Sequence, residues 1–123
     1  GNLNRIVSTL GTKFEIDVRN KIVLIEDISE SIEQIDLSLN QLRLSRKLEL
    51  AAGFVIGDFN MLSSEYSYDD VLNVIEGYIK PLNKPAVAGF KFGHCEPNIA
   101  IPLGVEAILD ADEKTLRILP GVE

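Results

Sequence analysis

The sequence predicts an α/β domain with a mixed sheet, in which a parallel β-α-β part precedes a C-terminal antiparallel hairpin. Two observations lead to this prediction. Up to residue 90, short apolar segments alternate with segments whose apolar residues follow the helical period. Beyond residue 98, the apolar residues fall into short strands separated by turn residues. Because parallel strands are joined by right-handed crossovers, the alternating part should form a parallel sheet.

The chain begins with a predicted helix, a strand and a second helix. Residues 3–10 place their apolar side chains at helical spacing, and Gly11 is a natural end for that helix. KIVLIED, residues 21–27, is a short apolar run that ends in two acids, as a buried parallel strand does. Ser31, followed three residues later by a glutamine, predicts a capping box at the start of a helix that runs to about Lys47.

The same order of strand and helix then repeats. AAGFVIGDF, residues 51–59, is again an apolar strand that ends close to an acid. Ser67 and Asp70 predict the N-terminal cap of a helix, and Pro81 ends that helix. PAVAGF, residues 85–90, predicts a third short strand.

The last quarter of the chain predicts strands without helices between them. Apolar residues at 99–101 and 105–109 indicate strands that are broken at residues 102–104. DADEK, residues 110–114, predicts a turn into a final strand at residues 115–119. These segments favour an antiparallel hairpin at the C-terminal end.

The helix that follows Ser31 carries two apolar stripes rather than one. One explanation is a helix that packs on both sides within its own core. The other is that the second stripe meets a partner domain or a dimer mate. The first stripe consists of Ile32, Ile35, Leu39 and Leu42, and the second of Leu37, Leu44 and Leu48.

The bulk composition is that of one globular domain over residues 1–123. A net charge of −7 argues against nucleic acid and anionic membranes as partners, because phosphate-binding faces need clustered Lys and Arg. No apolar run approaches the roughly 20 residues that cross a bilayer. With one cysteine and one histidine there is no credible zinc site, and we expect neither a metal nor a cofactor. The single cysteine suits a reducing compartment, and we expect a cytoplasmic protein.

Three groups of side chains suited to acid–base chemistry follow the predicted parallel strands, at the sheet edge where ligands bind in such folds. They are Glu26–Asp27, Asp58 and His94, the only histidine. An acid and an imidazole at one edge are what a general base and its orienting carboxylate need, because the carboxylate accepts the Nδ1 proton and fixes the tautomer. The alternative is a histidine that merely occupies a turn.

The neighbours of His94 have structural explanations. Cys95 points away from His94 in an extended segment, so a small buried thiol is expected rather than a Cys–His pair. Glu96 fits a solvated loop acid, and Asp58 fits a turn or cap. Gly93 should allow the tight backbone approach that exposes the next side chain. No serine lies in the G-x-S-x-G pattern of a nucleophile elbow.

Four segments resemble the C-terminal domain of LD-carboxypeptidases, a family of serine peptidases that also includes the microcin-immunity proteins. The similarity extends in order over nearly the whole chain, from Gly1 to about Leu119. The segments read GNLNRIVSTLGTKFE, KIVLIEDISE, IDLSLNQLRLSRKLELAAGFVIGDF and FGHCEPNIAIPLGVEAILDAD.

This resemblance implies the C-terminal domain of a two-domain enzyme, with a swivelling β/β/α fold. In that family the N-terminal domain carries the nucleophilic serine and the oxyanion hole. The C-terminal domain completes a Ser–His–Glu triad, and its two residues fall on Glu26 and His94. The usual substrate is a murein tetrapeptide, which loses its terminal D-alanine during cell-wall recycling. The microcin-immunity branch instead cleaves a peptidyl or aminoacyl nucleotide analogue.

Two departures from the family pattern accompany the resemblance. The nucleophile-bearing half is missing and the chain has no initiator methionine, so we expect a piece of a longer protein that is inactive by itself. At Leu37 the family often has an arginine, so a polar contact near Asp36–Leu37 should be lost. The alternative functions are a microcin-immunity-type hydrolase of acyl-adenylate analogues and a non-catalytic binding module.

Overall fold

The computed structural model describes residues 1–61 and 64–121. Its centre is a parallel sheet of three strands in the order β1 (Ile22–Glu30), β2 (Gly53–Met61) and β3 (Ala86–Val87). The helical elements of the described residues are α1 (Leu3–Ser8), α2 (Ile32–Leu44), α3 (Lys47–Leu50), α4 (Tyr68–Ile79) and the 3₁₀ turn η1 (Lys80–Leu82). No helix of the described residues is long and apolar enough to cross a membrane.

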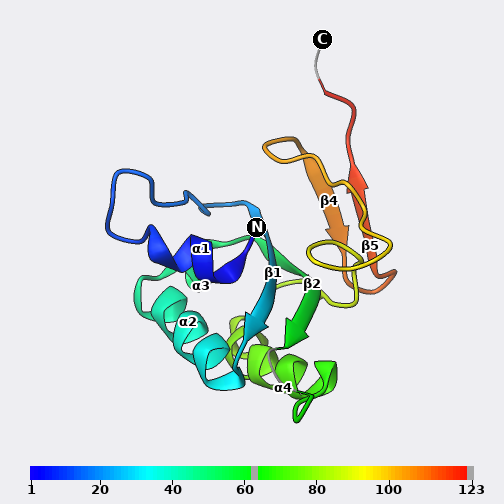
Figure 1. Ribbon diagram of the computed structural model, residues 1–123. Coiled ribbons are helices and arrows are strands. Elements are labelled where there is room, and N and C mark those ends of the chain that lie inside the picture. The colour runs from blue at the N-terminus through cyan, green and yellow to red at the C-terminus, as the bar shows by residue number, and fades with distance from the viewer. Residues whose placement is uncertain (62–63, 122–123) are drawn as a thin grey trace.

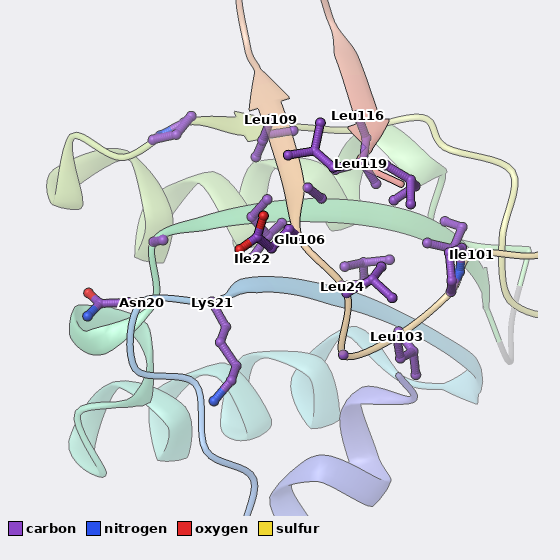
Figure 2. Close-up of a pocket in the computed structure, with 17 residues that line it drawn as sticks. Asn20, Lys21, Ile22, Leu24, Ile101, Leu103, Glu106, Leu109, Leu116 and Leu119 are labelled. Atoms are coloured by element: carbon purple, nitrogen blue, oxygen red, sulfur yellow. The ribbon is translucent and has the colours of Figure 1, made fainter. Parts of the chain in front are cut away.

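A separate antiparallel pair, β4 (Ala107–Asp110) and β5 (Thr115–Ile118), lies across the sheet from the helices (Figure 1). In Figure 2 the β4 ribbon passes in front of β2, whereas α4 lies behind it. The layers are therefore hairpin, sheet and helices, as a β/β/α arrangement requires. This confirms the predicted fold class, with the parallel and antiparallel strands in two sheets.

Both long crossover connections lie on one face of the sheet because its strands follow chain order and crossovers share one hand. This face carries the main hydrophobic core, while the opposite face is left to the hairpin and the loop before it. Core residues that meet between sheet and helices include Leu3, Val23, Ile25, Ile35, Leu39, Leu42, Phe54, Ile56, Val71, Ile75 and Ile79.

Side-chain caps set the starts of the two long helices. Ser31 Oγ accepts a hydrogen bond from the N–H of Gln34 at 3.1 Å, which confirms the predicted cap of α2. The Gln34 side chain bonds Ser38 Oγ at 3.5 Å, so only one half of the predicted capping box forms. At α4 both bonds of the box between Ser67 and Asp70 are present, as predicted.

The second predicted helix is interrupted before Lys47. Arg46 adopts a left-handed conformation with φ of 64°, which ends α2 and separates it from α3. This break resolves the second apolar stripe into two parts. Leu48 is buried in α3, whereas Leu37 and Leu44 of α2 are 60% and 68% exposed. The hydrophobic core between the sheet and the helices therefore covers only Leu48 of the second stripe.

The strands differ from their predicted limits. β1 and β2 continue beyond the acids expected to follow them, so Glu26 and Asp58 lie within strands. β3 is reduced to two residues, and residues 99–101 form a loop instead of a strand. The C-terminal hairpin forms as predicted, and its turn is closed by Asp110 Oδ1, which accepts the N–H groups of Asp112 and Glu113 at 3.0 Å each.

Candidate functional site

The structure brings Glu26 and His94 into direct contact, although 68 positions separate them in the chain. The distance from His94 Nδ1 to Glu26 Oε2 is 2.9 Å. The Glu26 side chain is 9% exposed and that of His94 is 50% exposed. A buried carboxylate thus holds one nitrogen of an imidazole that stays open to solvent.

A β-bulge lies beside Glu26. Ile25 pairs with Ile56 and Asp27 with Phe59, so the partner strand β2 places two residues opposite Glu26 where a regular ladder would place one. The main-chain N–H of Glu26 donates to Gly1 O at 3.2 Å on its other side. Glu26 is therefore held between a bulged strand and the N-terminal segment, a setting in which bulges commonly re-aim side chains.

Strand alternation separates the roles of the two adjacent acids in β1. Asp27 faces the helices and is 3% exposed. Its carboxylate accepts hydrogen bonds from Asn2 Nδ2 and from the N–H of Asn4, each at 2.9 Å. These bonds fasten the first turn of α1 to the sheet. Glu26 faces the opposite side of the sheet, where the loop with His94 passes.

Gly93 allows this close passage. Its φ is +112°, and a methyl group built there would lie 2.8 Å from Glu26 Oε2 and 2.9 Å from Glu26 Cβ. Both the conformation and the space demand glycine. The expected backbone role of Gly93 is thereby confirmed, and its cause is the side chain of Glu26.

Bonds within the loop fix its shape around His94. The N–H of Gly93 donates to Asn98 Oδ1 at 3.1 Å, and the N–H of Ile99 donates to Lys91 O at 2.7 Å. These bonds close the loop at its base. Asn98 was not singled out from the sequence, because an asparagine after a proline is a common loop pattern with no chemical signature of its own.

The other described residues considered in the sequence analysis form no hydrogen bond with the side chains of the Glu26–His94 pair. Cys95 is only partly buried, so the expectation of a buried thiol is wrong, and its thiol donates to Pro97 O at 3.4 Å within the loop. Glu96 is exposed, as expected. Asp58 lies in β2 opposite Glu26, and its N–H donates to Phe92 O at 3.0 Å. The prediction that Asp58 follows its strand is wrong because the bulge lets β2 continue past it.

Tyr68 is a further polar residue near the site that the sequence reasoning missed. Its hydroxyl donates to Gly57 O at 2.8 Å and accepts from the N–H of Gly89 at 3.2 Å. Burial raises the pKa of Tyr68 above the ordinary value of 10.0, so the hydroxyl keeps its proton at neutral pH. The signal available in the sequence was Gly57 in the middle of an apolar strand, since such glycines mark bulges.

The pair has the geometry of a general base. If Nδ1 donates its proton to Glu26, Nε2 carries a free lone pair that can take a proton from a nucleophile. No described residue forms a hydrogen bond with Nε2. Among the described residues there is no group of three or more His, Cys, Asp or Glu side chains that could hold a metal ion.

A cavity of about 620 Å³ lies on the face of the sheet that carries Ile22 and Leu24 (Figure 2). Ile22 and Leu24 of β1 form its floor, and Leu24 is two positions before Glu26, so their side chains share one face. The loop that follows His94 supplies one wall, with Ile101 and Leu103. Leu109 and Leu116 of the hairpin, among others, line the opposite side.

Two sequence comparisons bear on this arrangement. The family model of the LD-carboxypeptidase C-terminal domain matches residues 1–109. A probable murein peptide carboxypeptidase of Bacillus subtilis (strain 168) is 47% identical over 125 residues. The alignment covers 99% of this chain and 39% of that protein, so the chain spans well under half of the relative's length.

Solved structures share the fold. A muramoyltetrapeptide carboxypeptidase from Oxalobacter formigenes superimposes with a TM-score of 0.78 and 26% identity, over 96% of this chain and 42% of the other. The wild-type apo structure of microcin self-immunity protein MccF gives a TM-score of 0.77 and 28% identity, over 98% of this chain and 36% of the other.

Proposed function

Since this chain belongs to the LD-carboxypeptidase C-terminal domain family, we propose that it supplies the histidine and glutamate of a Ser–His–Glu triad. In this proposal the triad belongs to an enzyme that removes the terminal D-alanine from murein tetrapeptides. The nucleophilic serine comes from outside these 123 residues, in another part of the parent protein, the longer protein in which this chain occurs. We further propose that the parent protein works in the cytoplasm and that the 123-residue chain alone is inactive.

The contact between His94 and Glu26 carries this proposal. A turn histidine has no need of a buried carboxylate at hydrogen-bond distance from Nδ1, nor of a glycine whose missing side chain makes room for that carboxylate. The half-exposed ring leaves Nε2 accessible to a hydroxyl that arrives from outside the chain. The similarity to a probable murein peptide carboxypeptidase supports the choice of substrate.

The reaction would proceed in two halves. In acylation, His94 Nε2 takes the proton of the serine hydroxyl as the serine oxygen attacks the carbonyl before D-alanine. His94 returns that proton to the amine as the C–N bond breaks and D-alanine departs. In deacylation, His94 takes a proton from water as the water oxygen attacks the acyl carbonyl, and it returns that proton to the serine oxygen as the ester C–O bond breaks. Glu26 stabilises the imidazolium in both halves.

Substitution of His94 tests this proposal. In the parent protein, His94→Ala should lower kcat on a murein tetrapeptide by at least about 10³-fold, because the proton acceptor is removed. Cys95→Ala is the matched control, since it changes the adjacent side chain and should keep kcat within roughly twofold. A parent protein that retains normal turnover after His94→Ala has no triad at this pair.

A microcin-immunity-type activity is the second candidate, and the similarity to MccF favours it. The two activities share the proton transfers but differ in the acyl group and the leaving group. Turnover of a murein tetrapeptide and of a peptidyl sulfamoyl adenosine by the same preparation distinguishes them. We expect cleavage of the tetrapeptide, because the identity is higher to the murein peptide carboxypeptidase. Cleavage of the nucleotide analogue alone would reverse the order.

A further inference from the structure

The edge of the sheet next to β2 has an interruption close to the Glu26–His94 pair. β3 pairs with β2 through Ala86 and Val87. The chain then continues beside β2 as residues 88–93, which we call the edge segment. The N–H of Phe90 donates to Ile56 O at 3.3 Å, and Phe92 O accepts from the N–H of Asp58. Between Val87 and Phe90 the edge segment has more residues than the β2 stretch it follows. The regular backbone ladder therefore breaks there.

The hydroxyl of Tyr68 occupies this interruption. It donates to Gly57 O on β2 and accepts from the N–H of Gly89 on the edge segment, at 2.8 and 3.2 Å. Gly89 has a φ of +85°, which turns its N–H out of the regular ladder. One side-chain oxygen thus replaces a backbone-to-backbone bond between the two segments.

The two segments that Tyr68 joins lead directly to the pair. Gly57 lies in the bulge opposite Glu26, and a methyl group built on it would lie 2.7 Å from both the ring and the carbonyl oxygen of Phe92. Gly93 follows Phe92 and lies against Glu26. This packing has no free space, so a change in the spacing between β2 and the edge segment must move the loop that carries His94.

We propose that Tyr68 is a positioning residue for His94, whose hydroxyl sets the spacing of β2 and residues 89–93 and so keeps Nδ1 on Glu26. Its effect on turnover rests on the proposed function, whereas its effect on the His94–Glu26 contact does not. Among the described residues, the Tyr68 hydroxyl bonds Gly57 and Gly89 and forms no hydrogen bond with His94 or Glu26.

Tyr78 provides a matched control on the same helix. Its hydroxyl donates to Asp36 Oδ1 at 2.7 Å and so joins α4 to α2, on the helical side of the sheet. Tyr78→Phe removes a hydroxyl that bonds another element, as Tyr68→Phe does, but it leaves the edge segment untouched. A general loss of stability would affect both variants, whereas a loss of positioning would affect only Tyr68→Phe.

The first measurement is the ¹⁵N spectrum of His94 in the parent protein labelled at histidine, with assignment by His94→Gln. In the wild type and in Tyr78→Phe, we expect neutral His94 as the Nδ1–H tautomer, because Glu26 accepts that proton. In Tyr68→Phe, the Nε2–H tautomer should gain population. The proposal is overturned if Tyr68→Phe retains the wild-type tautomer ratio.

The second measurement is turnover. Tyr68→Phe should lower kcat roughly tenfold with KM unchanged, because the loss of the two hydroxyl hydrogen bonds misplaces the base without altering substrate contacts. Tyr78→Phe should keep kcat within twofold. If His94→Ala leaves turnover intact, the proposed function fails and the ¹⁵N spectrum alone decides the positioning role.

Amide exchange in the wild type keeps the proposal testable if Tyr68→Phe does not fold. The N–H of Gly89 should exchange slowly, because it is bonded to the Tyr68 hydroxyl, although the residue lies in an exposed part of the loop. Exchange of this amide at the rate of an unprotected loop would show that the bridge is absent and would overturn the proposal.

Discussion

The neighbours Glu26 and Asp27 are both buried acids in one strand, yet they serve different parts of the molecule. The period of two along β1 sends Asp27 toward α1 and Glu26 toward His94. Asp27 accepts hydrogen bonds from Asn2 and Asn4 of the same chain, so its role is to hold α1 on the sheet. Glu26 orients a ring whose second nitrogen is still free to react.

This difference predicts opposite results for the two amide substitutions. In the parent protein, Glu26→Gln should lower kcat by about 10³- to 10⁴-fold with little loss of stability, because the amide favours the wrong imidazole tautomer. Asp27→Asn should instead lower the free energy of unfolding by about 1–3 kcal/mol, because it weakens the bonds to Asn2 and Asn4. Steady-state kinetics and urea unfolding of both variants check this. Equal kinetic losses would contradict it.

Gly93 provides a second prediction at this scale. Gly93→Ala should abolish turnover and destabilise the fold, because the new methyl group collides with Glu26 in a conformation that L-residues avoid. Gly104→Ala is the control, since its φ is +73° but nothing lies within 4 Å of the added methyl. It should cost only the backbone strain of about 1–2 kcal/mol. Similar activity of the two variants would mean that the collision with Glu26 is relieved.

At the scale of elements, α2 is buried on one side and bare on the other. Leu39 is fully buried, while Leu37, two positions earlier, is 60% exposed. Leu39→Ala should therefore lower the free energy of unfolding of this chain by about 2–5 kcal/mol. Leu37→Ala should change it by no more than about 0.5 kcal/mol. Urea unfolding of the two variants provides the comparison.

The same pair of variants also tests the second apolar stripe. If a partner domain or a dimer mate covers Leu37, its substitution should cost clearly more in the parent protein than in the 123-residue chain. An equally small cost in both would leave the stripe without a partner. Leu39→Ala should cost the same in both, since its contacts lie within this chain.

The order of elements could be predicted from the sequence because each one depends on local patterns. Helix starts followed the capping residues Ser31 and Ser67, and the strands followed apolar runs. The break at Arg46 was missed, because a left-handed arginine has no local signature. The bulge beside Glu26 was also missed: Gly57 within an apolar strand is a sequence signal for a bulge, but the close packing of Phe92 on Gly57 is a tertiary contact that no local pattern predicts.

The site could be predicted in part for the same reason. Parallel strands bring their ends to one edge, which placed an acid and His94 together without identifying which acid. Spacing alone left Glu26, Asp27 and Asp58 as alternatives, and only the family resemblance indicated Glu26. Tyr68 could not have been found this way, because its contact with Gly89 depends on the interruption in the sheet edge.

At the scale of the whole molecule, alkaline unfolding should reveal the partly buried hydroxyl of Tyr68. Burial raises the pKa of Tyr68 above 10.0, so the native state holds this proton more tightly than the unfolded chain. Its contribution to stability is complete below about pH 10 and is lost as the pH rises through the native pKa. Tyr68→Phe should therefore show a shallower loss of urea midpoint between pH 9 and 11 than the wild type. Parallel curves would contradict this.

The division into two sheets has a consequence for modularity. Glu26 and His94 both belong to the parallel sheet and its edge, and the hairpin contributes neither of them. The hairpin turn at residues 111–114 is exposed for most of its length and bonds mainly to itself. That turn is consequently a natural attachment point, where an inserted peptide or a fluorescent label can be carried without disturbing the paired carboxylate and imidazole.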